Sequence, residues 1–428
     1  MERYEAYRDS GIEWIGEIPR HWQIAKLKTI GSISKGTGIK RDDVVEDGFP
    51  CVRYGELYTT YSNKLEFVKS QIPASLYSKC NHLKPGELLF ALTGETREDI
   101  GPCTMNCTEY EIAYGGDTAA FSVKYSDPAF LAYALNSEYF RKQKENAARG
   151  DIVVHLPVDK LLNATLVLPS PEEEAQIAAY LDEKSAGIDS LIEQTERSID
   201  LLEEYRKSVI TEAVTKGLDP DAPMKDSGID WIGKIPEHWS ISKVKYEFTN
   251  HDSLRRPVEA SLRSQDSESL YPYYGASGIV DTIDNYIFDG RRILIGEDGA
   301  NLVLRNLPLV YVAEGKYWVN NHAHILEPSE NLDFDYAAHQ LELIDLTDYI
   351  TGSAQPKLSQ ANLGQIPVVV PPVEEQRAIV RQINSSLCSL EESINTKRLL
   401  AERLKEYRKS LIYETVTGKI KVPGVDQA

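Results

Sequence analysis

The 428-residue chain lacks the features of a membrane or secreted protein. No apolar run approaches the roughly 18–20 residues that span a bilayer, and the charged N-terminus MERYEAYRDS has no signal-peptide core. Its five cysteines are odd in number and scattered, unlike a disulfide framework. The sequence therefore predicts a cytoplasmic protein with no membrane contact.

Catalytic motifs are also missing. The sequence has no phosphate-binding GxGxxG or GxxxxGK[ST], no HExxH and no GxSxG, and it lacks the Asn-Pro-Pro-aromatic string of DNA amino-methylating enzymes. Cys80, His82, Cys103 and Cys107 are too loosely spaced for a zinc site, so free thiols are favoured. His322 and His324 have no carboxylate at a readable spacing and are interpreted as loop or core histidines. We expect no catalytic residue, no metal and no cofactor on this chain.

Positive charge is in short supply. The net charge is −19 and the sequence pI is about 5.0. Residues 1–171 carry −3 and residues 218–373 carry −11. Neither segment offers the general basic surface that phosphate binding requires. If the chain binds nucleic acid, much of the phosphate contact must come from elsewhere, and this chain would supply base contacts.

The chain contains an internal duplication. Residues 9–28 and 226–245 are identical at 14 of 20 positions, as DSGIEWIGEIPRHWQIAKLK and DSGIDWIGKIPEHWSISKVK. Residues 204–215 and 406–417 match at 9 of 12 positions, and a Glu-rich start recurs at 172 and 374. The length difference between the copies falls in the stretches between these echoes. Each copy is therefore a variable domain followed by a constant segment.

The constant segments predict long amphipathic helices. Prolines and then carboxylates open each segment, and a glycine closes each one. Apolar residues recur at steps near three and four, and we predict that they form the contact stripe: Ile177, Leu181, Ile188, Leu191, Thr195, Ile199, Leu202, Tyr205 and Val209, then Ile379, Ile383, Leu390, Ile394, Ala401, Leu404, Tyr407 and Leu411. Two such stripes pair most simply as an antiparallel coiled coil. The alternative is two separate helices, each packed on its own domain.

The predicted fold class is α/β with an internal pseudo-two-fold repeat. Short apolar strings bounded by Gly and Pro, at 86–94, 291–299 and 307–315, indicate strands, whereas 130–149 and 334–346 indicate helices. The predicted domains are 1–171, helical spacer 172–217, domain 218–373, and 374–428 as a second spacer with the C-terminal tail.

Two copies of one domain on a rigid rod suit a linear polymer, and loops of both domains carry side chains that read base edges. Arg and Lys suit guanine, Asn and Gln suit adenine, and Thr methyls suit thymine. The candidate DNA-binding residues are Lys35, Thr37, Lys40, Arg41, Arg53, Tyr54, Thr93 and Arg97 in the first domain, and Tyr273, Tyr274, Ser277, Arg291, Arg292, Asn320, Asn321, His322, Gln355 and Lys357 in the second.

The repeated segments carry four of the five tryptophans. We interpret these as apolar anchors that fix each domain to its helix or to a partner, in preference to DNA stacking. The candidate partner-binding residues are Trp14, Trp22, Trp231, Trp239, Tyr205 and Tyr407.

The duplicated DSGI(E/D)WIG segments, the Glu-rich helix starts and the EYRKS helix ends resemble the specificity subunit of type I restriction–modification systems. The resemblance covers essentially the whole chain. The run TGSAQPKLSQANLGQIPVVVPPVEEQ, residues 351–376, is similar to the end of that family's target-recognition domains. The first copy departs from it, with GDIVVH at 150–155 in place of GSAQPK.

The resemblance implies a function. Each variable domain would bind one half of a bipartite double-stranded DNA target, and the helices would set the gap between the halves. Two methyltransferase subunits would carry S-adenosylmethionine, and a restriction subunit that uses ATP and Mg²⁺ can join them. The chain itself would be non-catalytic. Two alternatives stay open: a scaffold whose duplicated domains bind proteins, and a duplicated hydrolase, which the absence of a shared catalytic set disfavours.

Overall fold

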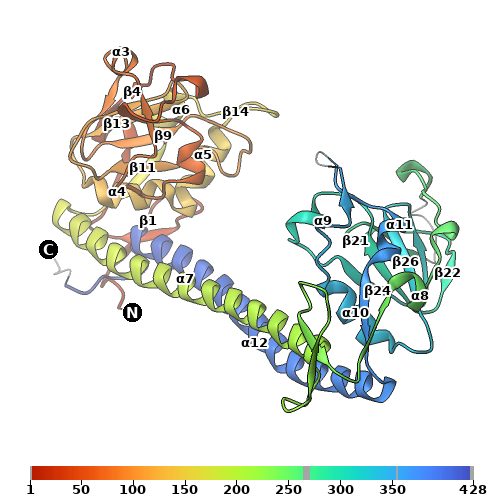
Figure 1. Cartoon of the computed structure of the whole chain (residues 1–428). Helices are drawn as coiled ribbons and strands as arrows, with labels where there is room; N and C mark the ends of the chain where they lie inside the picture. The colour runs from red at the N-terminus through yellow and green to blue at the C-terminus, as the bar shows by residue number, and fades with distance from the viewer. Residues whose placement is uncertain (1, 264–269, 353–354, 425–428) are drawn as a thin grey trace. The chain divides into compact units, whose positions relative to one another are not determined.

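The computed structural model describes residues 2–263, 270–352 and 355–424, in two compact units. Unit 1 extends to Glu196 and resumes at Arg398, whereas unit 2 comprises Arg197–Lys397. Each unit contains one β-rich domain, part of helix α7 (Pro171–Lys216) and part of helix α12 (Val373–Val416) (Figure 1). Both helices begin within one residue of their predicted starts.

The β domain of unit 1 is a two-sheet sandwich with helices on one outer face. Along strand β9, Leu89 and Ala91 face the second sheet, while Leu88 and Phe90 face helices α4 and α5. The first sheet has the order β4 (Gly31–Lys35), β13 (Thr118–Val123), β9 (Leu88–Ala91), β11 (Cys103–Asn106) and β6 (Lys64–Leu65). The second has the order β7 (Ser70–Ile72), β5 (Phe49–Val52), β12 (Ile112–Tyr114) and β8 (His82–Leu83). The helices are α4 (Pro128–Asn136) and α5 (Glu138–Ala147).

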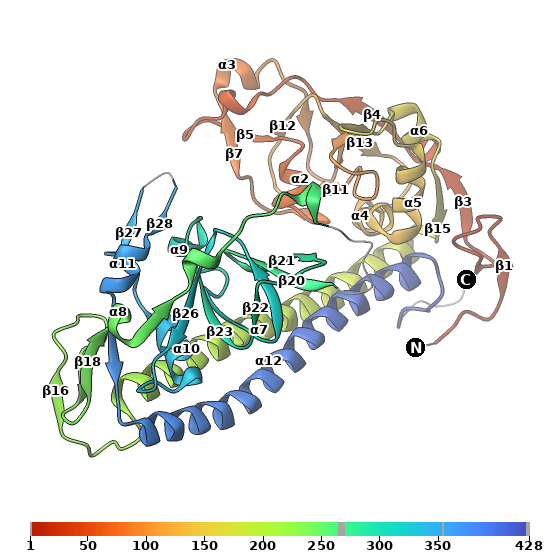
Figure 2. The ribbon, with the colours of Figure 1, turned by 90° about the vertical axis from the view of Figure 1, so that its right-hand side faces the viewer.

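Unit 2 contains a second two-sheet sandwich (Figure 2), and its strand order matches that of unit 1 except that, among the described residues, its first sheet has no counterpart of β6. Its first sheet has the order β19 (Phe248–Asn250), β26 (Ala323–Pro328), β23 (Arg292–Gly296) and β24 (Val310–Ala313), and its second has β21 (Gly278–Ile283), β20 (Tyr271–Gly275), β25 (Lys316–Val319) and β22 (Phe288–Asp289). Corresponding pairs have the same sense, including the one parallel pair in each second sheet, β5 with β12 and β20 with β25. Helix α10 (Phe334–Leu343) takes the place of α4. The two variable domains therefore share one fold, and the predicted α/β class is confirmed.

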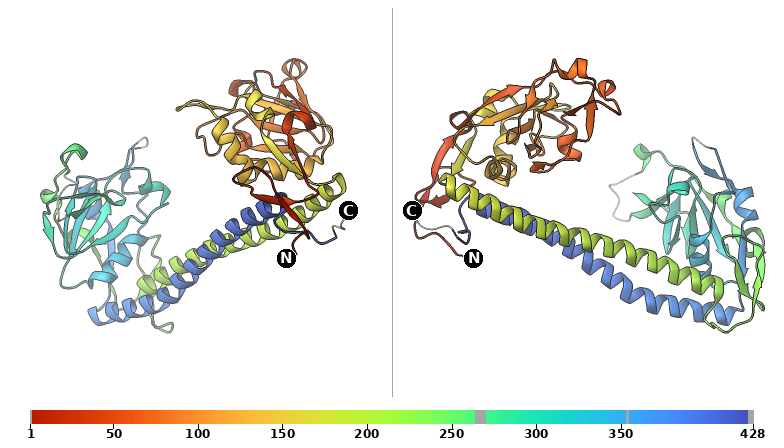
Figure 3. Two further views of the ribbon diagram at one scale, coloured as in Figure 1. Left: turned by 180° about the vertical axis from the view of Figure 1, so that it is seen from behind. Right: turned by 60° about the vertical axis from the view of Figure 1, so that its left-hand side comes forward.

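Smaller elements tie each domain to its helices. In unit 1 they are two antiparallel pairs, β1 (Tyr7–Asp9) with β2 (Glu17–Pro19) and β3 (Gln23–Lys26) with β15 (Thr165–Leu168). In unit 2 the equivalents are β16 (Met224–Asp226) with β17 (Lys234–Pro236) and β18 (Ser240–Lys243) with β29 (Pro367–Val370). The first and last described segments also meet in unit 1, where the Lys421 amide donates to the Glu2 carbonyl at 2.9 Å (Figure 3).

The long helices pack antiparallel within each unit. In unit 1, Lys405 Nζ lies 2.7 Å from Glu196 Oε1, and Arg408 Nε lies 2.9 Å from Asp189 Oδ1. In unit 2, Val214 near the end of α7 shares a core with Ile379 and Ile383 near the start of α12. The less exposed positions of α12 recur at alternating steps of three and four, at 383, 387, 390, 394, 397, 401, 404, 408 and 411. This is the 3.5-residue repeat of a coiled coil.

The same repeat corrects three positions of the predicted stripe. Leu191 is 51% exposed, and its neighbour Ile192 takes the buried position. Tyr205 and Tyr407 are 58% and 48% exposed, because the repeat places Arg206 and Arg408 in the seam instead. Among the described residues, no helix is long and apolar enough to cross a membrane.

A buried tryptophan of each repeat, together with the histidine before it, lies at the ends of the long helices in its unit. Trp22 is 1% exposed, donates from Nε1 to Glu173 Oε1 at 3.1 Å near the start of α7, and packs against Gly418, just after α12. Trp239 is equally buried and packs against Gly217, just after α7. The adjacent His238 contacts Glu375 of α12 through Nε2 at 2.8 Å. Trp22 and Trp239 therefore pack between their own domains and the ends of the long helices.

Candidate nucleic-acid interface

Loops that are far apart in the sequence meet at one edge of each β domain. In unit 1 this edge, called edge 1, comprises residues 35–37, 53–54, 92–97, 115–117 and 149–155. The amide of Leu92 donates to the Asp117 carbonyl at 2.7 Å, and the amide of Leu156 donates to the Leu92 carbonyl at 2.8 Å. The Gly115 amide donates to the Val52 carbonyl at 3.1 Å, just before Arg53. Several predicted DNA-binding loops therefore form one surface region.

Edge 2 has the same backbone frame in unit 2. It comprises residues 252–256, 275–277, 297–301, 320–322 and 355–357. The amide of Glu297 donates to the His322 carbonyl at 2.9 Å, and the amide of Leu358 donates to the Glu297 carbonyl at 2.8 Å. These two bonds repeat those made by Leu92 in unit 1. The residues Ser353 and Ala354 of the predicted loop lie outside the described residues.

The structure brings many predicted residues to these edges and leaves their side chains exposed or half-buried. Lys35, Thr37, Tyr54 and Arg97 lie at edge 1, and Lys40 and Arg41 follow on the same loop as Thr37. Ser277, Asn321, His322, Gln355 and Lys357 lie at edge 2. Arg53 also reaches edge 1, but its guanidinium Nε and Nη2 both donate to Glu56 Oε1, at 3.1 and 2.9 Å.

Four predicted residues are buried within the described structure. Thr93 is bonded to Asp117 Oδ1 at 3.1 Å and to His155 Nδ1 at 3.2 Å. Tyr273 is 1% exposed, and its hydroxyl accepts from the Val258 amide. Tyr274 and Asn320 are also buried. Residue type and loop position suggested these four, but their burial depends on strand pairing, and Tyr274 belongs to the core of the second sandwich.

Arg291 and Arg292 lie at the other end of β23 from edge 2, roughly 16 Å away along a five-residue strand. Arg291 pairs with Asp335 at 2.6 Å and lies over the ring of Phe334, while Arg292 pairs with Glu327 at 3.1 Å. The structure therefore does not bring these two arginines together with the other candidates of the second domain.

A buried charge cluster lies beneath edge 2. His324 is fully buried, with Nδ1 2.5 Å from Asp252 Oδ2 and Nε2 2.8 Å from the Leu358 carbonyl. Glu297, 7% exposed, pairs with Arg255 and, through Oε1, with Lys357 Nζ at 3.1 Å. Burial alone would raise the pKa of the Glu297 carboxyl, but the Arg255 hydrogen bond and the charge of His324 outweigh it and hold that pKa below its usual range.

Asp252, Glu297 and His324 form the group of possible metal ligands found among the described residues. The donor set does not fit a metal ion. Both ring nitrogens of His324 are already engaged, Nδ1 by Asp252 and Nε2 by the Leu358 carbonyl, so a metal ion would have to displace one of these contacts. Arg255 and Lys357 already supply positive charge to the carboxylates. The cluster is an ion-pair network.

The sequence did not reveal this network. Its signal was present only as single residues: Asp252 and Glu297 precede His324 by 72 and 27 positions, and no spacing pattern links them. The carboxylate that the sequence did not show beside His322 is Asp298, whose Oδ2 lies 2.8 Å from Nδ1.

The five cysteines, including the three considered for zinc, are free thiols.

The predicted partner-binding residues divide into two groups. Trp14, Trp22, Trp231 and Trp239 are buried or half-buried and pack within their own units. Tyr205 and Tyr407, which occupy matching positions of the EYRKS echoes, are exposed on the long helices. Of the six, the two tyrosines are the most exposed.

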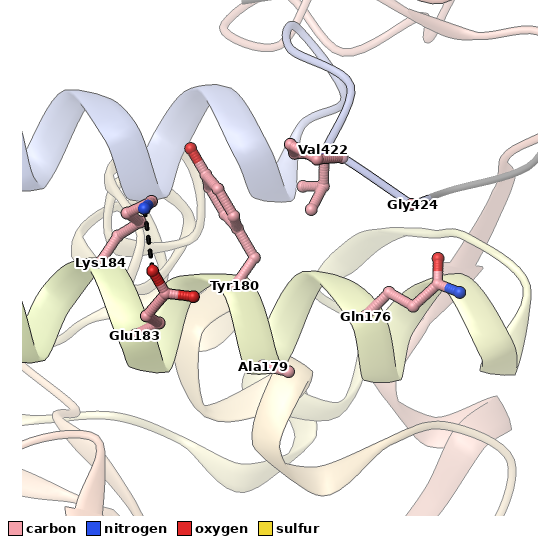
Figure 4. Close-up of a pocket in the computed structure, with 8 residues that line it drawn as sticks. Gln176, Ala179, Tyr180, Glu183, Lys184, Val422 and Gly424 are labelled. Atoms are coloured by element: carbon pink, nitrogen blue, oxygen red, sulfur yellow. Dashed lines mark hydrogen bonds and ion pairs between the residues drawn. The ribbon is translucent and has the colours of Figure 1, made fainter.

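A groove of about 620 Å³ lies in unit 1 beside the start of α7 (Figure 4). Gln176, Tyr180, Glu183 and Lys184 line it from α7, and residues 422–424 line it from the segment after α12. Lys184 is paired with its neighbour Glu183 at 3.0 Å. None of the predicted DNA-binding residues borders this groove, so it does not form part of either edge.

Comparisons with known proteins agree with this architecture. Residues 254–399 match the family model described as type I restriction modification DNA specificity domain. A putative type I restriction enzyme MjaX specificity subunit from Methanocaldococcus jannaschii is 24% identical over 95% of this chain and 96% of its own length. A putative type I restriction enzyme specificity subunit from Haemophilus influenzae is 35% identical, over 31% of this chain and 34% of that protein.

The fold matches as well. A chain solved in work on complex assembly and conformational transition of the type I R-M system superposes with a TM-score of 0.70, at 14% identity, over 94% of this chain and 99% of that chain. Residues 254–399 therefore match a DNA specificity domain, and the chain shares the fold of that solved chain. Over nearly its whole length the chain is thus similar to proteins named type I restriction enzyme specificity subunits.

Proposed function

We propose that the chain is a specificity subunit in which each β domain binds one half of a bipartite DNA target through its loop edge. The observation that carries this proposal is the pair of edges: two domains of unrelated loop sequence present side chains suited to base edges at the same place in the same fold. Edge 1 offers Lys35, Arg97 and Tyr54, and edge 2 offers Asn321, His322 and Lys357. Different side chains on one frame suit two different half-sites.

The long helices would set the gap between the half-sites. Helix α7 has 46 residues, or about 69 Å at 1.5 Å per residue, and it begins in unit 1 and ends in unit 2. Helix α12 has 44 residues and runs from unit 2 to unit 1. A paired rod of fixed length would hold the spacing constant while the domains vary.

Two methyltransferase subunits would dock on the repeated parts of the chain. The exposed Tyr205 and Tyr407 occupy matching repeat positions, so they offer two copies of one contact. S-adenosylmethionine would bind to those subunits, and ATP and Mg²⁺ to a restriction subunit where one joins. Because the chain is acidic overall, the partners would supply most phosphate contacts. Because the proposed target is chromosomal DNA, we expect the protein in the cytoplasm.

Methylation mapping tests the proposal. The chain is co-expressed with its methyltransferase subunit, and methylated adenines are located by single-molecule sequencing. We expect one bipartite motif with an unread gap of fixed length. Replacing residues 226–370 with the corresponding domain of another specificity subunit should change one half-site and leave the other half-site and the gap intact. A change in both halves would contradict modular recognition.

The docking surface needs its own comparison. Tyr205→Ala or Tyr407→Ala should each weaken the retention of one methyltransferase copy, measured as the mass of the purified complex. Tyr125→Ala is the matched control, because Tyr125 is 73% exposed but lies outside the long helices. If the chain instead captured other proteins and left methylation unchanged, the scaffold alternative would hold.

A further inference from the structure

The two edges differ at one buried position of their shared frame. Leu92 and Glu297 make the same two backbone hydrogen bonds, and the strand register then aligns Ala119 with His324. In unit 1 this location is apolar, since Leu92 and Ala119 are both buried. In unit 2 it holds a carboxylate and an imidazole. Burying charges is costly, so the fold alone does not explain why unit 2 carries them.

The network connects buried residues to one exposed cation. Asp252, Glu297 and His324 are all less than 9% exposed, and Arg255 binds both carboxylates from one side. On the other side, Lys357 Nζ lies 3.1 Å from Glu297 Oε1 while its side chain is 54% exposed. An ammonium has three N–H donors. Glu297 occupies one of them, which leaves two for a ligand at edge 2.

The same network fixes the backbone around Lys357. The Leu358 amide donates to the Glu297 carbonyl at 2.8 Å, and the Leu358 carbonyl accepts from His324 Nε2 at 2.8 Å. Asp298, next to Glu297, forms an antiparallel backbone β-bridge with Lys357, and its carboxylate contacts His322 Nδ1. A flexible four-carbon side chain discriminates poorly between bases unless something restrains it, and Glu297 restrains this one at its charged end.

We propose that Glu297 is a positioning residue that holds Lys357 for a base contact in the second half-site. This inference rests on the proposed function and deepens it. The base edge that suits a lysine ammonium in the major groove is guanine, with its O6 and N7 acceptors. Glu297 itself does not touch DNA. Asp252, His324 and Arg255 keep its carboxylate in place from below.

The test uses the complete complex of the chain with its methyltransferase subunits. Duplexes with single base-pair changes in either half-site compete for binding, and discrimination is the affinity ratio between the correct and the changed duplex. Lys357→Ala should lower discrimination about tenfold at one G·C pair of the second half-site and leave the first half-site unaffected. Glu297→Gln should lower discrimination at that same pair. Lys357→Arg should retain part of it, because arginine also recognises guanine.

The double variant separates positioning from a general structural effect. If Glu297 acts through Lys357, adding Glu297→Gln to Lys357→Ala causes no further loss of discrimination. Glu297→Asp is the second variant: it keeps the negative charge for Arg255 but shortens the reach to Lys357, and it should also lower discrimination. Lys405→Ala is the matched control. Lys405 lies on α12, pairs with Glu196 at 2.7 Å, and has a side chain that is 55% exposed, much like that of Lys357. That control should leave both half-sites unchanged.

Three results would overturn the proposal: full discrimination in Lys357→Ala, additive losses in the double variant, or relaxation at an A·T pair. These differ from failure of the proposed function, in which the unmodified complex would recognise no bipartite site. Thermal melting of each variant establishes folding. A Glu297→Gln chain that does not fold leaves the decision to Glu297→Asp and Lys357→Ala.

Discussion

Glu174 and Gln376 occupy the same position in the two repeats, and each accepts a hydrogen bond from the backbone amide of the residue that caps a packed helix. The donor is Asp127 N at 2.6 Å in unit 1 and Asp333 N at 2.7 Å in unit 2. Asp127 caps α4 and Asp333 caps α10. One geometry is thus served by a carboxylate in one unit and by an amide in the other.

This relationship predicts the outcome of a reciprocal swap. Burial raises the pKa of Glu174 to about 7, despite the hydrogen bonds from Asp127 and Ser126 that lower it. For a carboxyl group with a raised folded-state pKa, stability is fully present below its unfolded pKa and is lost as pH rises through the folded value. Glu174→Gln should remove the loss of stability that accompanies a rise in pH from about 4.5 to 7. Melting temperatures measured across this range test it.

Gln376→Glu is the complementary change. It should introduce in unit 2 the same loss of stability over the same pH range, because Gln376 is fully buried. A Glu174→Gln protein that melts with the pH dependence of the unmodified chain would contradict the assignment.

The two glycines beside the anchoring tryptophans should differ in their tolerance of substitution. Gly217 and Gly418 have φ values of 76° and 71°, so alanine costs roughly 1–2 kcal/mol at either position. At Gly418 an added Cβ would also lie 2.3 Å from Pro19 Cδ, whereas at Gly217 the nearest atoms are 3.1 Å away. Gly418→Ala should therefore lower the melting temperature clearly more than Gly217→Ala. Equal losses in calorimetry would argue against the tight corner around Pro19 and Trp22.

Lys144 predicts an alkaline gain in stability. Its side chain is 3% exposed and donates to the carbonyls of Gly101 and Leu135. Burial lowers the pKa of the Lys144 ammonium to about 8 from 10.5. Between these values the unfolded chain binds more protons, so stability should rise with pH. Lys144→Met should lack this rise, and chemical unfolding at pH 8 and pH 10 measures it. Lys142→Met, at an exposed position of the same helix, is the control.

The ruler role predicts the effect of lengthening both helices. A seven-residue insertion near Ile199 and another near Ala401 keep the 3.5-residue repeat and add about 10 Å to the rod. At about 3.4 Å per base pair, the unread gap should grow by roughly one to three base pairs while both half-sites stay the same. Insertion in one helix alone should abolish activity, because it breaks the seam. An unchanged gap with methylation retained would assign the spacing to the partner subunits.

The repeats made the architecture predictable from the sequence, because helix starts, closing glycines and the tryptophan anchors recur in order. The sequence was less informative where one residue decides. Both Leu191 and Ile192 lie three or four residues from Ile188, so spacing alone allowed either in the contact stripe. The alternating three-and-four repeat of the coiled coil selects Ile192. At the edges, residue type could not separate the exposed Lys357 from the buried Tyr273, because burial depends on strand pairing between distant segments. The same reason hid the partners of His324.

The contrast between Leu92 and Glu297 has a consequence for how such proteins evolve. An apolar side chain beneath edge 1 can be exchanged for another of similar volume in single steps, at a cost usually below about 1.5 kcal/mol. Beneath edge 2, losing one member of the ion-pair network leaves a buried charge without its partner, which costs roughly 3–5 kcal/mol. New specificities of the second domain would therefore arise more readily by recombination of whole gene segments than by gradual drift.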